Sequence, residues 1–155
     1  MSDPQFHTFT TAVVAALQAD SQIGGAGVLV FDGPPVSGDA GATEIVVGGS
    51  FDTDQTDAGG FTQDWRTDGG ASATRDETIR LNCELRYWTG DPDMAAARSG
   101  AFALLAQVSR VLRANTSLGV AALLWCHITS GTVTQELNSG AVVTVAFTIT
   151  AEAQI

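Results

Sequence analysis

Apolar and polar residues alternate strictly over residues 78–88, TIRLNCELRYW, the most regular pattern in the chain. The apolar positions are Ile79, Leu81, Cys83, Leu85 and Tyr87, and the polar ones are Arg80, Asn82, Glu84 and Arg86. A period of two over this length predicts an antiparallel strand with one face packed on a core and the other in water.

Two other segments carry apolar residues at the three- and four-residue spacing of a helix. The first is expected to begin where Ser2 or Asp3 caps the chain ahead of Pro4, and to run to about Asp20 before the glycine pair at 24–25. Its apolar residues are Phe6, Phe9, Val13, Ala16 and Leu17.

The second helix is expected to open at residues 90–93, GDPD, by the same combination of cap and proline, and to end within residues 115–119. Its apolar stripe comprises Ala97, Ala101, Leu104, Leu105, Val108 and Leu112. Arg110 and Arg113 fall in the last turn, where the helix dipole favours cations.

Shorter apolar runs predict strands over residues 27–32, 43–47, 119–129 and 141–151. The first of these ends at Pro34 and Pro35, which lack N–H groups, so the chain has to turn there. In the last strand the expected inner face consists of Val143, Val145, Phe147 and Ile149.

The run at 119–129 is apolar on both faces, which predicts a central strand or one covered twice. Residues 132–137 either continue this strand or turn back after Ser130 and Gly131. Residues 138–140, NSG, predict a hairpin turn into the final strand.

Residues 48–76 have a different composition, because glycine and aspartate dominate and the large apolar residues are Phe51, Phe61 and Trp65. We predict a long loop or an extended hairpin that is ordered only against something else. The three aromatic residues have no obvious place in a two-layer core. We therefore expect them to anchor this segment, either on this protomer or on the next one.

Together these elements predict a single domain over residues 1–155 in the order α-β-β-(long loop)-β-α-β-β, with the loop inserted at 48–76. This order is typical of an α+β two-layer sandwich, in which two helices cover one face of a mostly antiparallel sheet of about four to six strands. The other sheet face is expected to be polar, lined by Arg80, Glu84, Arg86, Thr144, Thr148 and Thr150.

The charge balance narrows the range of partners and chemistries. Seventeen acidic residues against seven arginines give a net charge of −10, which repels nucleic acid at a distance unless the arginines cluster. The chain has no lysine, which excludes a Walker A phosphate loop, Schiff-base chemistry and a lysine general base. Charged residues make up only 15% of the chain, which mildly favours packing against copies or partners.

No residue pattern predicts an enzyme. The glycines at 25 and 27 precede a strand and Val30 occupies the third glycine position, so a dinucleotide-binding loop is excluded. Residues 48–52, GGSFD, lack the closing glycine of a nucleophile elbow, and a Ser-His-Asp triad would need His127 in the middle of a strand. Neither cofactors nor metals are expected.

The cysteines and the amino end bear on where the protein works. Cys83 and Cys126 lie in apolar stretches, which favours two buried thiols in a reducing compartment over a disulfide. Residues 1–9, MSDPQFHTF, are unlike a signal peptide, and the longest apolar run is half a membrane span. A soluble protein made inside a cell is expected.

Asp52, Asp54 and Asp57 form the one cluster of carboxylates with the character of a cation site. An EF-hand counted from Asp52 requires Gly at its sixth position and Glu at its twelfth, where this chain has Asp57 and Gln63. A solvated acidic loop is the default interpretation, and a cation site of another type stays open.

The chain resembles the tail terminator proteins of long-tailed bacteriophages, also called head-to-tail connector or minor tail proteins. The stretches that carry the resemblance are VLVFDGPPV, TEIVVGG, TRDETIRLNCELRYWTGDPDMAAARSGAFALLAQVSRVLRAN, TSLGV and NSGAVVTVAFTITAEAQI. Each stretch is loose by itself, and their order over most of residues 6–151 is more specific than any one of them. The insertion at 48–76 is longer and richer in glycine than the family pattern requires.

The resemblance implies a small α+β protomer that assembles as a homo-hexameric ring at the head–tail junction of a virion, after assembly in the host cytoplasm. Such a ring caps the finished tail tube, ends polymerisation of the tail tube protein and offers a docking face to the head-tail connector or head-completion proteins of the neck. DNA passes through the lumen without specific binding, which the net negative charge suits.

On this interpretation Arg80, Glu84 and Arg86 are positioned to form pairs between subunits, and a merely solvated strand face is the alternative. Phe51, Phe61 and Trp65 would contact a neighbouring subunit or the tube. Two other functions stay open from the sequence: another neck or head-completion protein of the same virion, and a small cation-binding domain that uses the carboxylates at 52–57.

Overall fold

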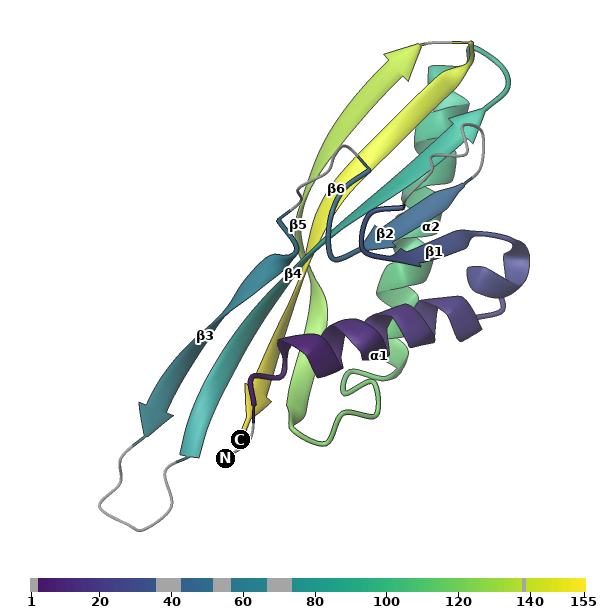
Figure 1. Ribbon diagram of the computed structural model, residues 1–155. Coiled ribbons are helices and arrows are strands. Elements are labelled where there is room, and N and C mark those ends of the chain that lie inside the picture. Colours follow the sequence, from purple (N-terminus) through teal and green to yellow (C-terminus); the bar gives the residue numbers. More distant parts are fainter. Residues whose placement is uncertain (1–2, 36–42, 52–56, 67–73, 138) are drawn as a thin grey trace.

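The computed structural model describes residues 3–35, 43–51, 57–66, 74–137 and 139–155 (Figure 1). Its elements are α1 (Phe6–Ala19), a 3₁₀ turn (Gly24–Ala26), β1 (Leu29–Asp32), β2 (Glu44–Val47), β3 (Gly59–Arg66), β4 (Thr74–Thr89), α2 (Met94–Ala114), β5 (Leu123–Leu137) and β6 (Ala141–Gln154). Within these ranges no helix has the length and apolar character needed to cross a membrane.

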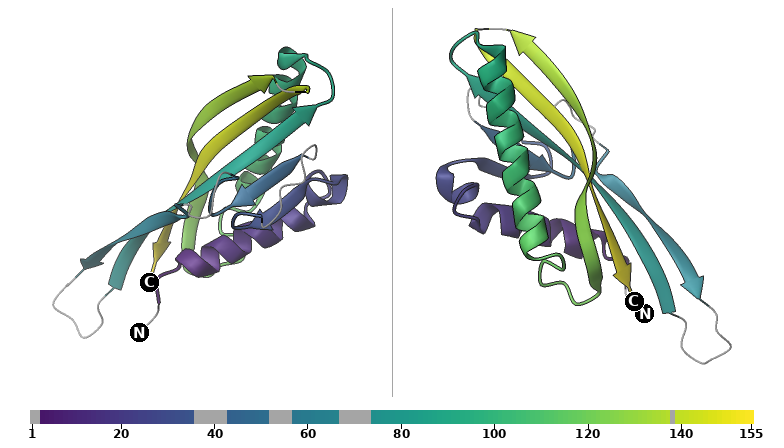
Figure 2. Two further views of the ribbon diagram at one scale, coloured as in Figure 1. Left: turned by 45° about the horizontal axis from the view of Figure 1, so that its top comes forward. Right: turned by 180° about the vertical axis from the view of Figure 1, so that it is seen from behind.

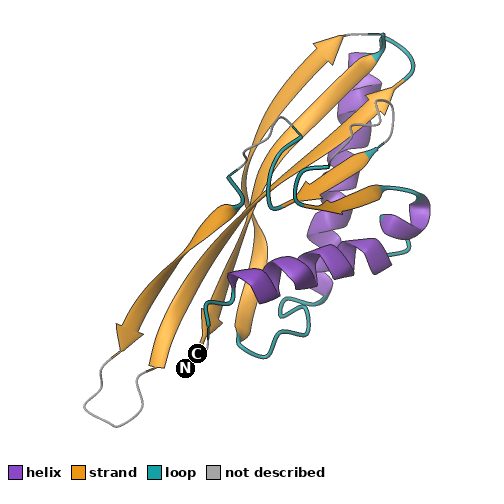
Figure 3. Ribbon diagram, in the orientation of Figure 1, coloured by secondary structure: helices purple, strands orange, loops and turns teal. Residues whose placement is uncertain are grey.

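One six-stranded sheet carries the fold, in the order β1-β2-β4-β6-β5, and β3 pairs with β4 as well (Figure 3). β2 and β3 lie end to end along the same side of β4: β2 pairs with residues 83–86 and β3 with residues 74–81. β1 and β2 are parallel, whereas every other pair is antiparallel. The predicted α+β class with a mostly antiparallel sheet is confirmed.

The two helices and the inner face of the sheet form one hydrophobic core. α1 packs mainly on β1, β2 and β4, whereas α2 lies across β4, β6 and β5, as Figure 2 shows from behind. The alternating residues of β4 and β6 supply the sheet side of this core: Ile79, Leu81, Cys83, Leu85, Val143, Val145, Phe147 and Ile149. Burying each of the larger side chains contributes roughly 1.5–3 kcal/mol, so the period-two pattern is energetically decisive.

The predicted loop at 48–76 contains a strand that the sequence order lacks, and of the two interpretations the extended hairpin holds for its described residues. Residues 59–66 form β3, and β4 begins at Thr74 rather than near Thr78. Six of the eight β3 residues are exposed, so this strand has no packed face and no alternation in its apolar residues. It is held by its ladder with β4.

The prediction that residues 119–129 form a central strand is wrong, because β5 is the outermost strand of the sheet. It begins at Leu123, continues through Gly131 to Leu137, and has ladder irregularities between Leu123 and Trp125 and between Ile128 and Ser130. The first irregularity takes Leu124 out of the alternation and leaves it 56% exposed. The chain therefore reads as apolar on both faces although one of them is open.

The helix α1 starts without the predicted cap at Asp3, and Ser2 lies outside the described residues. Its first residue is preceded by Gln5, whose N–H donates to the Glu77 carboxylate of β4 at 2.6 Å. Gln63 of β3 donates to the other Glu77 oxygen at 2.6 Å, so this buried carboxylate joins three elements. A partner so distant in sequence is invisible to a local capping rule. In α2 the helix opens at the predicted place, but the cap is Asp93, which follows Pro92 instead of preceding it and accepts the Ala96 N–H at 3.1 Å.

Arg110 of α2 forms an ion pair with Asp20, directly after α1, with 2.6 Å between Nη2 and Oδ1. Burial alone would raise the pKa of the Asp20 carboxyl. The hydrogen bonds from Arg110 and from the Gln22 N–H, together with the guanidinium charge, outweigh it and hold the pKa below its ordinary value. The pair fixes the carboxyl end of α1 against α2.

Both cysteines are buried and reduced, and we expect neither to react with a thiol reagent at pH 8. Burial raises the pKa of the Cys83 thiol to about 12, against a small opposing effect of the Gly48 backbone, and that of Cys126 to about 11. The thiolate is the reactive form, so titration with Ellman's reagent should release no colour before denaturant is added. Rapid reaction of either thiol in the folded protein would contradict the burial.

Candidate functional site

The outer face of the sheet carries an ion pair that is partly closed to solvent. Arg86 of β4 meets Glu44 of β2 with 2.6 Å between Nη2 and Oε2, and the Glu44 side chain is only 1% exposed. The Arg86 guanidinium also lies over the Phe51 ring, 4.4 Å from its centre. The pair thus clamps β2 to β4 and holds the first residues that follow β2.

Glu84 belongs to the same cluster, because its carboxylate accepts a hydrogen bond of 3.4 Å from the Phe51 N–H. Three of the residues predicted for a subunit interface, Phe51, Glu84 and Arg86, are therefore brought together within one chain. Arg80, two residues before Asn82 on the same face, is exposed and has Gly60 opposite it on β3. The Arg80 side chain is thus open to solvent.

The hairpin of β3 with the first half of β4, here called the arm (59–66 and 74–81), extends beyond the helices at the lower left of Figure 1. Phe61 and Trp65 lie on the side of the arm that continues the helix-covered face, yet they are 48% and 55% exposed because no helix reaches them. Arg75 lies 5.1 Å below the Trp65 ring and is itself buried. The arm therefore exposes two aromatic side chains to solvent.

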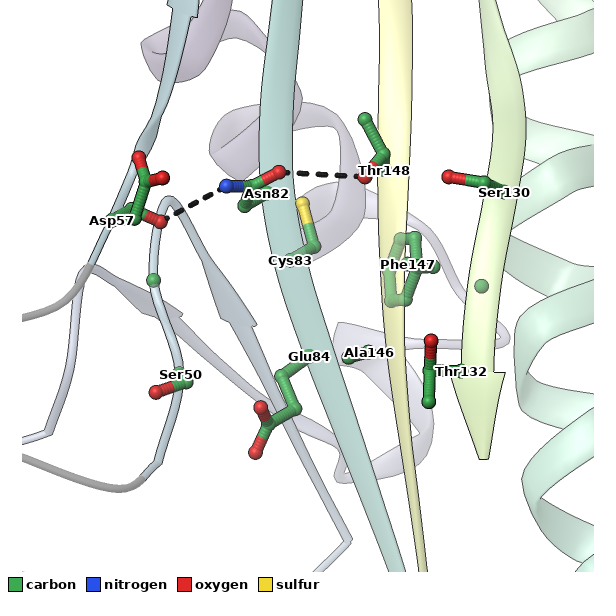
Figure 4. Close-up of a pocket in the computed structure, with 12 residues that line it drawn as sticks. Ser50, Asp57, Asn82, Cys83, Glu84, Ser130, Thr132, Ala146, Phe147 and Thr148 are labelled. Atoms are coloured by element: carbon green, nitrogen blue, oxygen red, sulfur yellow. Dashed lines mark hydrogen bonds between the residues drawn. The ribbon is translucent and has the colours of Figure 1, made fainter. Parts of the chain in front are cut away.

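A hollow of about 350 Å³ opens on the outer face where the chain passes from β2 to β3 (Figure 4). Asn82 crosses its floor: its amide donates to the Asp57 carbonyl at 3.2 Å, and its oxygen accepts from the Thr148 hydroxyl at 3.3 Å. Ser50, Glu84, Ser130 and Thr132 add hydroxyl and carboxylate oxygens to the walls. Such a lining can exchange hydrogen bonds with a polar group that enters the hollow.

The predicted carboxylate cluster falls mostly outside the described residues, since Asp52 and Asp54 belong to residues 52–56. Asp57 is described, and its carboxylate accepts the Gly59 N–H at 3.0 Å, which organises the turn into β3. Among the residues that the structure describes, no three Asp, Glu, His or Cys side chains gather as metal ligands would.

Two strands of the sheet, β5 and β3, each have one side that pairs with no other described strand. Among the residues that the structure describes, β5 pairs with β6 alone, and residues 129–137 of β5 are all exposed. In the same described ranges, β3 pairs with β4 alone. β1, by contrast, is four residues long and its Val30 carbonyl accepts a hydrogen bond from Gln18 of α1, which protects that edge.

Three surface or site residues were not predicted from the sequence: Val133 and Leu137 of β5 and Glu44 of β2. Val133 and Leu137 are 43% and 63% exposed, and the available signal was two apolar residues in an otherwise polar segment. Glu44 has no local signal, because its partner lies 42 residues away. His127, the candidate base of a triad, is exposed and stacked on Trp125, 4.4 Å between ring centres.

No protein-family model and no curated protein matches the sequence. The fold is similar to that of a chain in a solved structure described as the virion of a native gene transfer agent (GTA) particle. The similarity covers 94% of this chain and 94% of that chain, with a TM-score of 0.59 and 16% sequence identity. At this identity the likeness shows a shared fold.

Proposed function

We propose that this chain is a structural virion protein without enzymatic activity. The observation that carries the proposal is the fold, which it shares with a chain of a gene transfer agent virion over nearly the full length of both. The resemblance of the sequence to tail terminator proteins supports the same class independently. Fold similarity alone does not assign function, so the surfaces of the molecule have to support the role as well.

Within that class we propose the role of a tail terminator: a homo-hexameric ring that caps the tail tube, ends its polymerisation and docks the neck proteins. Two features of the chain support a ring. Its sheet has a free side at each end, and exposed apolar residues lie on the arm and on β5. In this role Arg80, Phe61 and Trp65 contact a neighbour, whereas Phe51, Glu84 and Arg86 shape the surface beside them.

The charge supports a role around a DNA channel. A ring of six chains, each with a net charge of −10, repels the phosphate backbone and lets DNA pass without sticking. The junction of a virion head and tail is the location that follows, with assembly in the host cytoplasm.

The test is polymerisation of the tail tube protein of the same virion in the presence of this chain. We expect shorter tubes with extra density at one end in negative stain, because capped ends no longer grow. The same amount of chain added after polymerisation should mark the tube ends and leave the length distribution unchanged. An unaltered length distribution in the first mixture, with unmarked ends, would overturn the terminator role.

A second candidate is another neck or head-completion protein of the same virion. It shares the fold argument but predicts binding to the head connector and none to tube ends, so the same microscopy separates the two. A small cation-binding domain has less support, because Asp57 already serves the turn into β3. Stabilisation of the chain against heat by calcium would favour it.

A further inference from the structure

The free sides of β3 and β5 match each other, and we propose that they pair between two copies of this chain. Residues 133–137 of one copy lie antiparallel to residues 61–65 of the next, so that the sheet continues from subunit to subunit. The inference rests on the ring of the proposed function and names the contact that closes it. Backbone direction, side-chain pattern, charge and space each support it.

The backbone groups of both segments face outward at the right positions. The Asn82 N–H donates to the Ala58 carbonyl. The residues of β4 whose side chains lie on the outer face therefore direct their backbone N–H and C=O groups toward β3, and the residues paired with them on β3 direct theirs toward β4. Phe61, Gln63 and Trp65 alternate with those partners and therefore direct their N–H and C=O groups to the free side.

The same reasoning applies to β5. The Gln154 N–H donates to the Ala122 carbonyl, so the residues of β6 whose side chains lie on the outer face direct their backbone N–H and C=O groups toward β5. Their partners on β5 include Thr134 and Glu136, which leaves Val133, Gln135 and Leu137 with outward N–H and C=O groups. These three residues are free to form a new ladder.

The side chains follow one pattern on both segments. β3 reads Phe-Thr-Gln-Asp-Trp over 61–65 and β5 reads Val-Thr-Gln-Glu-Leu over 133–137, each an apolar pair flanking Thr, Gln and an acid. In the antiparallel register Phe61 faces Leu137, Gln63 faces Gln135 and Trp65 faces Val133, all on the helix-covered side. The exposed apolar side chains of the two segments thus cover one another.

The acids decide the direction of pairing. Antiparallel, Asp64 lies opposite Thr134 and Glu136 lies opposite Thr62, so no carboxylates face each other across the new ladder. A parallel arrangement in register would place Asp64 directly opposite Glu136, and like charges in that position destabilise a sheet.

The direction is also the one that a ring requires. β5 runs the same way as β4, since both are antiparallel to β6, whereas β3 runs against β4. Rotation about a ring axis keeps strand direction and the covered face the same in each copy. β5 of one copy therefore meets β3 of the next antiparallel, in a head-to-tail contact that can close on itself.

The space beside β3 fixes a stagger between the copies. Beside residues 83–86 of β4, the position next to β2 is already occupied by β1. The end of β5 from a neighbouring copy therefore has to lie beyond β1, toward the start of β4. Within one sheet, Leu137 is aligned through Ala141 with Thr89 of β4. Phe61 is aligned with Ile79, which is ten residues earlier on β4. A shift of that size clears β1 and tilts the strands from the ring axis, as closure of a sheet requires.

The test is cross-linking of the full chain carrying both Trp65→Cys and Val133→Cys, with a short bis-maleimide. The native cysteines are buried, so the added thiols are the reactive ones. We expect a ladder on a denaturing gel at multiples of 16.0 kDa, whose highest band counts the copies in the ring. The pair Phe61→Cys with Leu137→Cys should give the same ladder.

The matched control is Trp65→Cys with Thr129→Cys, which moves one thiol four residues along the same exposed strand. It should give at least tenfold less cross-linked product. As a second measurement, Gln135→Pro removes an outward N–H together with the hydrogen bond that the Gln135 amide oxygen accepts from Arg98 at 2.7 Å, whereas Gln135→Ala removes that side-chain bond alone. The proline variant, and not the alanine one, should convert the ring to monomers in light scattering while its melting temperature stays within a few degrees of that of the alanine variant.

The outcomes separate this inference from the proposed function. Rings that cap tubes but cross-link through neither cysteine pair, or equally well through Thr129→Cys, overturn the contact and leave the terminator role in place. Cross-linked rings that leave tube length unchanged overturn the role and leave the contact in place. A chain that stays monomeric both in solution and on tube ends overturns both.

Discussion

Replacing Gly59 by alanine is expected to lower the free energy of unfolding by about 3 kcal/mol or more and to release β3 from β4. Gly59 has a φ of +133°, a conformation that side-chain-bearing residues rarely adopt. A Cβ there would lie 2.0 Å from the Arg80 carbonyl oxygen, a backbone atom that cannot turn aside. Denaturant titration gives the loss, and hydrogen exchange over residues 59–66 shows where it falls.

The matched control is Gly60→Ala, one residue along the same strand. A Cβ on Gly60 meets nothing within 4 Å, so the change in stability should stay within about 0.5 kcal/mol. Equal stability of the two variants would contradict the account of β3 as a strand that begins in a position only glycine tolerates. The prediction bears on function because the arm carries Phe61 and Trp65.

The parts of the fold that pack on the core could be predicted from the sequence, because burial leaves a period in the apolar residues. β4 and β6 each have one face on the core and show the period of two, and α2 shows the helical period. The two-layer α+β architecture follows from these elements and their order. Local patterns are sufficient where one face of an element is buried.

The remaining elements depend on partners that are distant in sequence or absent from the core. β3 has no packed face, so its residues resemble a loop until β4 is placed beside it. The irregularity after Leu123 interrupts the alternation of β5, so its sequence has the apolar pattern of a central strand although β5 lies at the edge of the sheet. Glu77 accepts the N–H of Gln5, the residue before α1, from a position 72 residues away, beyond the reach of any local rule.

The candidate interface was predictable in part for the same reason. Phe61 and Trp65 stood out because large apolar residues in a polar segment need a partner, and both prove exposed. The polar residues of β4 gave no indication of how they would divide. Arg86 forms an ion pair with Glu44 of the same chain, whereas Arg80 is exposed. The alternation of apolar and polar residues cannot distinguish these two arginines.

Replacing Arg86 by methionine is expected to lower the free energy of unfolding by about 3 kcal/mol, because it leaves the Glu44 carboxylate buried without its cation. Glu44 is 1% exposed, so water cannot substitute for the guanidinium. The same change removes the stacking on the Phe51 ring, which contributes about 0.5–1 kcal/mol at a site of this exposure. Denaturant titration at neutral pH measures the sum.

The double variant Arg86→Met with Glu44→Met distinguishes a buried unpaired charge from simple loss of packing. Removing both charges should recover at least about 1 kcal/mol relative to Arg86→Met alone, since an apolar pair no longer pays the desolvation of a lone carboxylate. If the losses of Arg86→Met and of Glu44→Met measured singly simply added up in the double variant, the result would contradict the pairing of β2 with β4 through charge. In that case the surface around Phe51 would depend on the β2–β4 ladder, and Arg86 would be available to a neighbouring subunit after all.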